Sequence, residues 1–104
     1  MDNNKHIVLI TGVTRGLGLA MAEKFIALGH TVLGCGRSVR IIDNLREQNA
    51  KRHDFDVVDV AVAAQVNKWA ERLHIRYGAP AILINNAGII NRNAPLWKVP
   101  AQEF

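Results

Sequence analysis

A short apolar run that breaks into a glycine-rich turn is the feature that most limits how this chain can fold. The run covers residues 7–10, and the turn carries Gly12, Gly16 and Gly18. A continuous apolar run of this length is typical of a strand buried on both faces of a parallel sheet. Glycines let backbone N–H groups approach a phosphate closely, and the positive end of a helix dipole adds to the attraction. The stretch therefore predicts a strand, a turn and a helix that together bind an anion.

The glycines are spaced Gly-x-x-x-Gly-x-Gly, which differs from the common dinucleotide fingerprint Gly-x-Gly-x-x-Gly. No lysine follows Gly18, which argues against a nucleoside triphosphatase. A plain connection between a strand and a helix is the alternative interpretation. We favour anion binding because a strand precedes the turn and a helical pattern follows it, which is the context that such a motif requires.

Apolar strands and amphipathic helices alternate along the rest of the chain. Further strands are expected over residues 31–35, 53–56 and 81–85, with helices after the glycine turn and over residues 38–48 and 61–77. This alternation predicts an α/β fold, a partial Rossmann-type doubly wound parallel sheet of about four strands in the order 3-2-1-4 with flanking helices. Residues 89–104 are predicted to form a loop, with the first turn of a helix at 100–104.

Each helix is expected to turn one apolar face toward the sheet. In the first helix, the face is predicted to hold Leu17, Met21, Phe25 and Leu28. The second is expected to be capped by Ser38 and to face inward with Ile41, Ile42 and Leu45. In the third helix, the corresponding residues are Val62, Val66, Trp69 and Leu73.

Composition excludes several classes of function. The net charge of +4 comes from scattered basic residues, so we expect no nucleic-acid partner. One cysteine, Cys35, rules out an intrachain disulfide and is predicted to be a small buried residue. The sequence shows no signal peptide and no membrane-length apolar run, so a cytoplasmic protein is expected. The histidines at positions 6, 30, 53 and 74 are expected on the surface, with no metal site among them.

The residues after the second strand indicate which dinucleotide is bound. An acidic residue at this place usually holds the ribose 2′-hydroxyl, but the sequence here is Cys35-Gly36-Arg37-Ser38. A guanidinium suits a 2′-phosphate, and Arg15 in the glycine turn is expected to reach the same group. NADP(H) is therefore predicted in preference to NAD(H). The alternative is that Arg37 is simply a solvated residue at the end of a strand.

Three features in this order resemble the N-terminal half of a short-chain dehydrogenase/reductase. They are residues 11–18, the pair Asp59-Val60, and the quartet Asn85-Asn86-Ala87-Gly88, and the resemblance extends over residues 7–104. It implies that the pyrophosphate is bound by Gly12, Thr14, Arg15, Leu17 and Gly18. It further implies adenine contacts from Asp59 and Val60, a ribose contact from Asn86, and NADP preference from Arg37. Taken alone, the quartet could be only a turn.

The sequence also departs from the pattern of that family. Ala61 and Val62 follow Asp59-Val60 where an acid or capping residue is common, which weakens the predicted cap of the third helix. The family's catalytic Ser and Tyr-x-x-x-Lys are absent, because the single tyrosine, Tyr77, is followed four residues later by Ala81. Tyr77 is expected to pack at a helix end, and no catalytic residue is assigned. Residues 1–104 are thus expected to be the N-terminal part of one NADP-binding domain, truncated before the catalytic segment.

Three functional hypotheses follow from these residues. The first is an NAD(P)-dependent oxidoreductase that transfers hydride between nicotinamide and a small carbonyl or alcohol substrate, present as a part that is inactive alone. The second is a stand-alone or partner-completed NADP(H)-binding module without catalysis, and a remnant that barely folds is a third possibility. The apolar fourth strand is expected to lie at a sheet edge, where it invites oligomerisation or aggregation.

Overall fold

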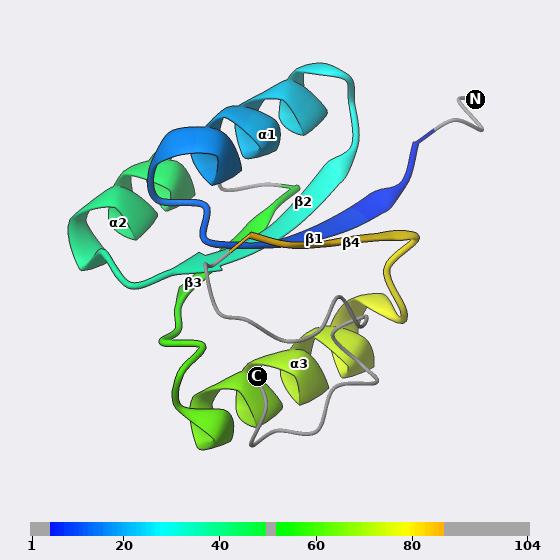
Figure 1. Cartoon of the computed structure of the whole chain (residues 1–104). Coiled ribbons are helices and arrows are strands. Elements are labelled where there is room, and N and C mark those ends of the chain that lie inside the picture. The colour runs from blue at the N-terminus through cyan, green and yellow to red at the C-terminus, as the bar shows by residue number, and fades with distance from the viewer. Residues whose placement is uncertain (1–4, 50–51, 87–104) are drawn as a thin grey trace.

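A four-stranded parallel sheet organises the computed structural model, which describes residues 5–49 and 52–86 (Figure 1). In chain order the elements are β1 (Ile7–Thr11), α1 (Gly16–Ala27), β2 (Thr31–Gly36), α2 (Val39–Gln48), β3 (Asp54–Val57), α3 (Ala63–Tyr77) and β4 (Ile82–Asn85). The strands are all parallel and lie in the order β3-β2-β1-β4. The predicted α/β class and strand order are therefore confirmed. The loop predicted over 89–104, its helical turn and residues 87–88 lie outside the described residues.

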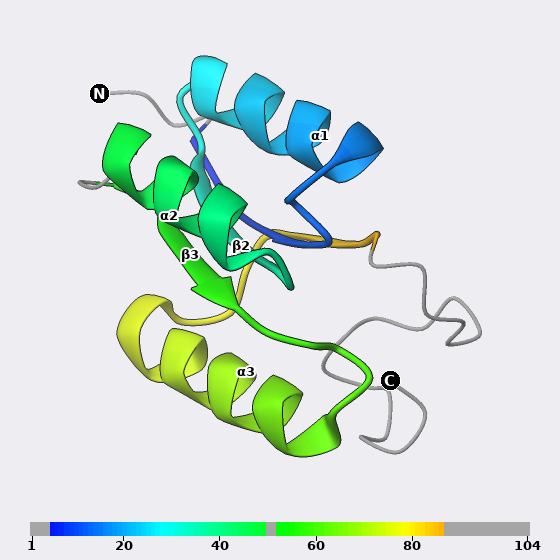
Figure 2. The same ribbon diagram turned by 90° about the vertical axis from the view of Figure 1, so that its left-hand side faces the viewer.

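The helices form two layers, with α1 and α2 on one face of the sheet and α3 on the other (Figures 1 and 2). Successive residues of β1 point to opposite faces, because side chains alternate along a strand. Val8 and Ile10 belong to the apolar cluster on the side of α1 and α2, whereas Leu9 belongs to the cluster on the side of α3. All three are fully buried, as expected for a strand covered on both faces.

The inward face of α1 differs from the prediction. Leu17 and Leu28 are 66% and 56% exposed, so their expected packing against the sheet was wrong. The buried residues of α1 are Gly18 and Ala22, and Met21 and Phe25 are half-buried beside them. The real face keeps Met21 and Phe25 but is centred on the side of Gly18 and Ala22. Small side chains at Gly18 and Ala22 let the helix backbone approach the sheet, and they decide which face turns inward.

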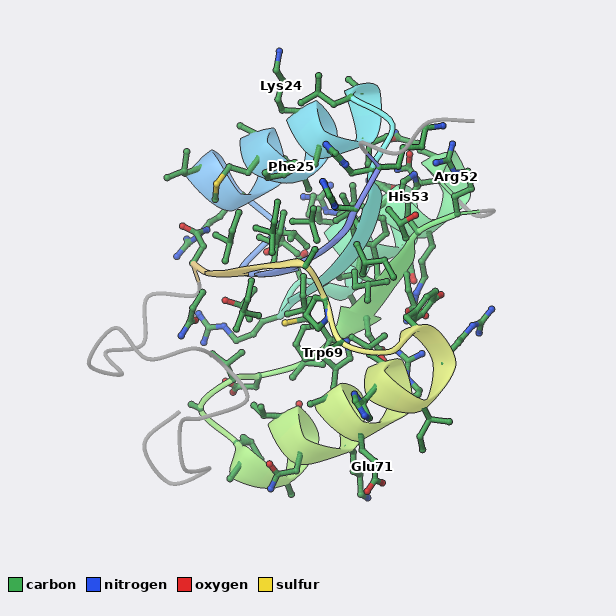
Figure 3. All side chains as sticks on the ribbon, turned by 90° about the vertical axis from the view of Figure 1, so that its right-hand side faces the viewer. Lys24, Phe25, Arg52, His53, Trp69 and Glu71 are labelled. Carbon is green, nitrogen blue, oxygen red and sulfur yellow. The ribbon has the colours of Figure 1, made fainter. Side chains whose placement is uncertain are left out.

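The other two helices follow the predictions more closely. Ser38 caps α2 as predicted, since its Oγ accepts a hydrogen bond from the N–H of Ile41 at 3.3 Å. Ile42 and Leu45 are buried, and Ile41 is half-buried. In α3, the predicted residues Val66, Trp69 and Leu73 are buried, and Figure 3 shows Trp69 between α3 and the sheet. Val62 is 40% exposed, against prediction, because it precedes the helix as its N-cap residue.

A network of charged groups covers the outer strand β3. The guanidinium of Arg72 in α3 donates to the carboxylate of Asp54 at 3.1 Å, and that of Arg46 in α2 donates to the carbonyl of Phe55 at 2.9 Å. Burial alone would raise the pKa of Asp54, but Arg72 outweighs it and the pKa is lowered. Tyr77 donates its hydroxyl to Asp54 at 3.1 Å, which confirms that it packs at the end of α3. These charges protect an edge strand from pairing with another chain.

His53 was expected at the surface but has a structural role instead. It is half-buried, and its Nδ1 accepts the backbone N–H of Val32 at 3.0 Å. β3 pairs with β2 only from Asp54 onward, opposite Leu33, so the imidazole takes the place of a backbone carbonyl. His53 lies beside Arg52 at one end of the sheet (Figure 3). Burial, with the positive charge of Arg52, lowers the pKa of His53 below its ordinary value of 6.5.

This arrangement predicts a loss of stability in mild acid. The unfolded chain binds a proton at His53 more readily than the folded chain does, so the contribution of His53 is complete above its ordinary pKa and declines as the pH falls below it. Urea unfolding should show a fall in the free energy of unfolding, by about 1 kcal/mol or less, between roughly pH 7.5 and pH 5.5. The variant His53→Asn keeps an acceptor without a titrating ring and should lose less. An equal loss in both proteins would contradict this role.

Candidate functional site

A pocket of about 630 Å³ opens at the carboxyl edge of the sheet. Segments that follow all four strands contribute to its wall, because the carboxyl ends of parallel strands meet at one edge. The lining residues are Gly12, Thr14, Arg15, Cys35, Gly36, Arg37, Ser38, Val58, Asp59, Val60, Ala61 and Asn86. Seven of the nine residues predicted to bind a cofactor are in this wall, all except Leu17 and Gly18.

The glycine turn and the start of α1 bring backbone N–H groups close to the pocket. Gly12 and Gly16 have φ angles of 71° and 57°, a left-handed conformation that side chains disfavour. Arg15 is the N-cap of α1 in extended conformation, with no hydrogen bond from its side chain to the first turn, and the first turn contains no acidic residue. The first N–H groups of a helix have no partner within it, and groups of this kind suit an anion.

Gly18 supports this turn instead of lining the pocket. A Cβ built at Gly18 would overlap the carbonyl oxygen of Gly12 and the side-chain amide of Asn86. The absence of a side chain at Gly18 therefore lets the first turn of α1 pack directly against the start of the loop. Leu17, the other predicted contact that does not line the pocket, has a largely exposed side chain.

Polar side chains from β1 and the end of β4 hold the turn in place. The hydroxyl of Thr11 donates to Oδ1 of Asn85 at 3.0 Å and accepts from the backbone N–H of Asn86 at 2.8 Å. Asn86 Nδ2 in turn donates to the carbonyl of Gly12 at 3.2 Å. The side chain of Asn86 thus fixes the glycine turn, while the residue also lines the pocket. Sequence reasoning assigned Asn86 a ribose contact and did not foresee this supporting bond.

Arg15 and Arg37 line the same pocket although 22 positions separate them in the chain. Both side chains are exposed, and within residues 5–49 and 52–86 neither guanidinium forms a salt bridge. Guanidinium groups bind phosphate through two parallel hydrogen bonds. Both arginines line one pocket, and the expectation that both reach one phosphate stays a prediction.

Asp59 and Val60 belong to the same wall. Val60 is 7% exposed and belongs to the apolar cluster against α3. The carboxylate of Asp59 accepts the N–H of Ala61 at 3.0 Å, and the backbone N–H of Asp59 donates to Oε1 of Gln65 at 2.8 Å. The weak helix cap predicted from Ala61 and Val62 is confirmed, because Val62 makes no capping bond with its side chain. The hydrogen bond between Gln65 and Asp59 was not predicted from the sequence.

Sequence reasoning also missed several residues of the wall. Gly36 is one of them, and its lack of a side chain matters because a Cβ there would overlap the side chain of Thr14. Its position directly before Arg37 in the sequence was the signal that could have identified it.

The thiol and metal chemistry of the described residues is limited. Cys35 is buried as predicted, and burial raises the pKa of its thiol to about 12, so it is not a reactive thiolate. No group of three or more metal-binding side chains occurs among the described residues, and no helix there is long and apolar enough to cross a membrane.

A sequence model of the family described as short chain dehydrogenase matches residues 6–104. The chain therefore belongs to the short-chain dehydrogenase family, whose expected fold the sheet order and the glycine turn already indicated. Residues of this chain are 39% identical over 99 positions to an NADPH-dependent pterin aldehyde reductase of Arabidopsis thaliana, covering 93% of this chain and 41% of the reductase.

Two solved structures of similar proteins share the fold. A short-chain dehydrogenase from Streptomyces avermitilis has a TM-score of 0.76 at 33% identity, covering 85% of this chain and 32% of the other. L-Sorbose reductase from Gluconobacter frateurii, solved with NADPH and L-sorbose, has a TM-score of 0.68 at 30% identity, covering 92% of this chain and 38% of the reductase. The chain thus spans less than half the length of each of these proteins.

Proposed function

We propose that this protein binds NADP(H) in the pocket at the carboxyl edge of the sheet, in preference to NAD(H). The observation that carries the proposal is the presence of two arginines, Arg15 and Arg37, in one wall without an ion-pair partner among the described residues. No acidic residue occupies residues 35–38, where NAD-binding chains usually hold the ribose hydroxyl. The plant reductase and L-sorbose reductase, by their names and bound cofactor, both use NADPH.

The residues divide into roles according to their chemistry. Gly12, Thr14 and Arg15 of the glycine turn, with Leu17 and Gly18 at the start of α1, would hold the pyrophosphate. Arg37 would bind the 2′-phosphate. Asp59 and Val60 would contact the adenine, and Asn86 would border the ribose while it holds Gly12. When bound, the cofactor supplies a hydride acceptor or donor to the reaction.

As the function of the whole protein we propose hydride transfer between nicotinamide and a small carbonyl or alcohol substrate. This chain would contribute the cofactor-binding part, because its sequence contains no Tyr-x-x-x-Lys. Tyr77 cannot replace that pair, since its hydroxyl is bound to Asp54, and burial together with the charge of Asp54 raises its pKa. We therefore expect no turnover by the 104-residue chain alone. A cytoplasmic location belongs to the same proposal.

A cofactor-binding module completed by another chain is the second candidate. The observation that favours it is β4, whose four residues are all partly exposed and which pairs only with β1 within the described sheet. An apolar strand at an edge can accept a further strand. Oligomerisation through β4 stays a prediction.

A titration tests the proposal directly. NADPH and NADH are added separately to the purified protein, and binding is followed by the fluorescence of the reduced nicotinamide. We expect NADPH to bind at least about tenfold more tightly than NADH, since a lost charged hydrogen bond is worth about 1.5–3 kcal/mol. Absence of NADPH binding, or tighter binding of NADH, would overturn it. Oxidation of NADPH by the chain with any ketone would overturn the expected lack of turnover.

A further inference from the structure

The wall segment Asp59–Ala61 is held by a side chain that does not itself line the pocket. Gln65, in the first turn of α3, is exposed, and its Oε1 accepts the backbone N–H of Asp59 at 2.8 Å. The segment leaves the end of β3 and leads directly into α3, which lies on the opposite face of the sheet from α2 (Figure 2). The position of this wall therefore depends on where α3 begins.

The hydrogen bond between Gln65 and Asp59 differs from the usual capping box at a helix N-terminus. Gln65 is the third residue of α3, and a glutamine at this place usually accepts the N–H of the N-cap residue. Here the N–H of the N-cap residue, Val62, is bound instead to the carbonyl of Asp59 at 2.9 Å. The amide of Gln65 is thus free to reach back to Asp59.

Three hydrogen bonds consequently surround Asp59. Its N–H donates to Gln65, its carbonyl accepts from Val62, and its carboxylate accepts from the N–H of Ala61 at 3.0 Å. Because Ala61 and Val62 offer no capping side chain, Gln65 is the only side chain of α3 that bonds to Asp59 among the contacts within residues 5–49 and 52–86. Gln65 therefore holds the backbone at Asp59, while the N–H of Ala61 holds its carboxylate.

We propose that Gln65 is a positioning residue that sets the preference of the pocket for adenine. The inference rests on the proposed binding of NADP(H), with Asp59 as the contact to the base. A carboxylate accepts hydrogen bonds and so favours the 6-amino group of adenine over the 6-carbonyl group of hypoxanthine. Gln65 acts through the backbone of Asp59 and sharpens that choice by holding the carboxylate in one orientation.

The test compares two ligands that differ only in the base, NADP⁺ and nicotinamide hypoxanthine dinucleotide phosphate. Binding of each is measured for the wild-type protein, Gln65→Ala, Gln65→Glu and the control Asn67→Ala. Asn67 is an exposed amide residue of the same helix that lies outside the pocket wall. Gln65→Ala should weaken NADP⁺ by about three- to tenfold and the hypoxanthine analogue by less than about twofold. Gln65→Glu keeps an acceptor oxygen and should stay within about threefold of the wild type, while Asn67→Ala should not change either affinity.

The outcomes separate this inference from the proposal on which it rests. If the wild-type protein binds neither ligand, both fail. If the wild type binds NADP⁺ but Gln65→Ala weakens both ligands equally, or neither, the positioning role alone is overturned. Hydrogen exchange of the Asp59 amide provides a check that needs no alanine variant. The amide should be protected in the wild type and in Gln65→Glu, and rapid exchange in the wild type would overturn the inference.

Discussion

Gly18→Ala is expected to abolish NADPH binding and to lower the free energy of unfolding by about 3 kcal/mol. The added Cβ would overlap the carbonyl of Gly12 and the amide of Asn86. Gly12 cannot move away easily, because Asn86 Nδ2 donates to that same carbonyl and Thr11 holds the N–H of Asn86. The turn must therefore change shape, and the amides that would bind the pyrophosphate lose their common direction. Urea unfolding and a titration with NADPH measure the two effects.

Gly16→Ala is the matched control for this prediction. Gly16 also has a positive φ, 57°, but a Cβ at this position meets no atom within 4 Å. Alanine there carries only the backbone strain of the left-handed conformation, about 1–2 kcal/mol. At Gly18 the better helix propensity of alanine, about 1 kcal/mol, works against the expected loss and makes the test stringent. If Gly18→Ala is no more damaging than Gly16→Ala, the close packing of α1 against Gly12 has no energetic importance.

Arg37→Ala is expected to weaken NADPH by roughly 10- to 100-fold and NADH by less than about threefold. The guanidinium lies in the pocket wall, is exposed, and forms no salt bridge in the described part of the chain, so its removal should leave folding almost unchanged. The loss should fall on the 2′-phosphate, which NADH lacks. Parallel titrations with the two dinucleotides measure the ratio, and thermal unfolding confirms that the variant is folded.

Arg40→Ala removes an equal charge from a nearby place and serves as the control. Arg40 is exposed in the first turn of α2 and does not line the pocket. We expect its removal to change the NADPH affinity by no more than about twofold, through long-range attraction that salt screens. A similar loss from Arg40→Ala and Arg37→Ala would mean that net charge alone attracts the cofactor. An equal loss of NADPH and NADH in Arg37→Ala would remove Arg37 from the 2′-phosphate site.

Local patterns predicted much of this molecule. The apolar run of β1, the glycine turn and the capping by Ser38 each depend on residues close together in the chain, so their physics can be read from the sequence. The same holds for the apolar spacing of Val66, Trp69 and Leu73 in α3. The pocket wall could be predicted in outline because the carboxyl ends of parallel strands must meet at one edge. Arg15 and Arg37 were expected at this edge for that reason.

Contacts between distant segments could not be predicted in this way. The inward face of α1 is set by how closely Gly18 approaches Gly12, which leaves Leu17 and Leu28 of the predicted face exposed. His53 acts as an acceptor because β3 begins one residue too late to satisfy Val32. Asn86 was expected to bind a ligand, yet its side chain also holds a turn 74 positions earlier in the chain.

The sequence by itself determined the order of elements, the parallel sheet and the edge of the sheet where Arg15 and Arg37 line one pocket. These follow from hydrophobic periodicity and from the conformations open to glycine, which act over a few residues. Only the tertiary structure decided which face of α1 packs inward, and which polar groups, Asn86 and Gln65 among them, hold the walls of the pocket. The first choice depends on how closely distant segments can pack. The second depends on donors and acceptors that meet only after the chain has folded, because each buried polar group must then find a partner.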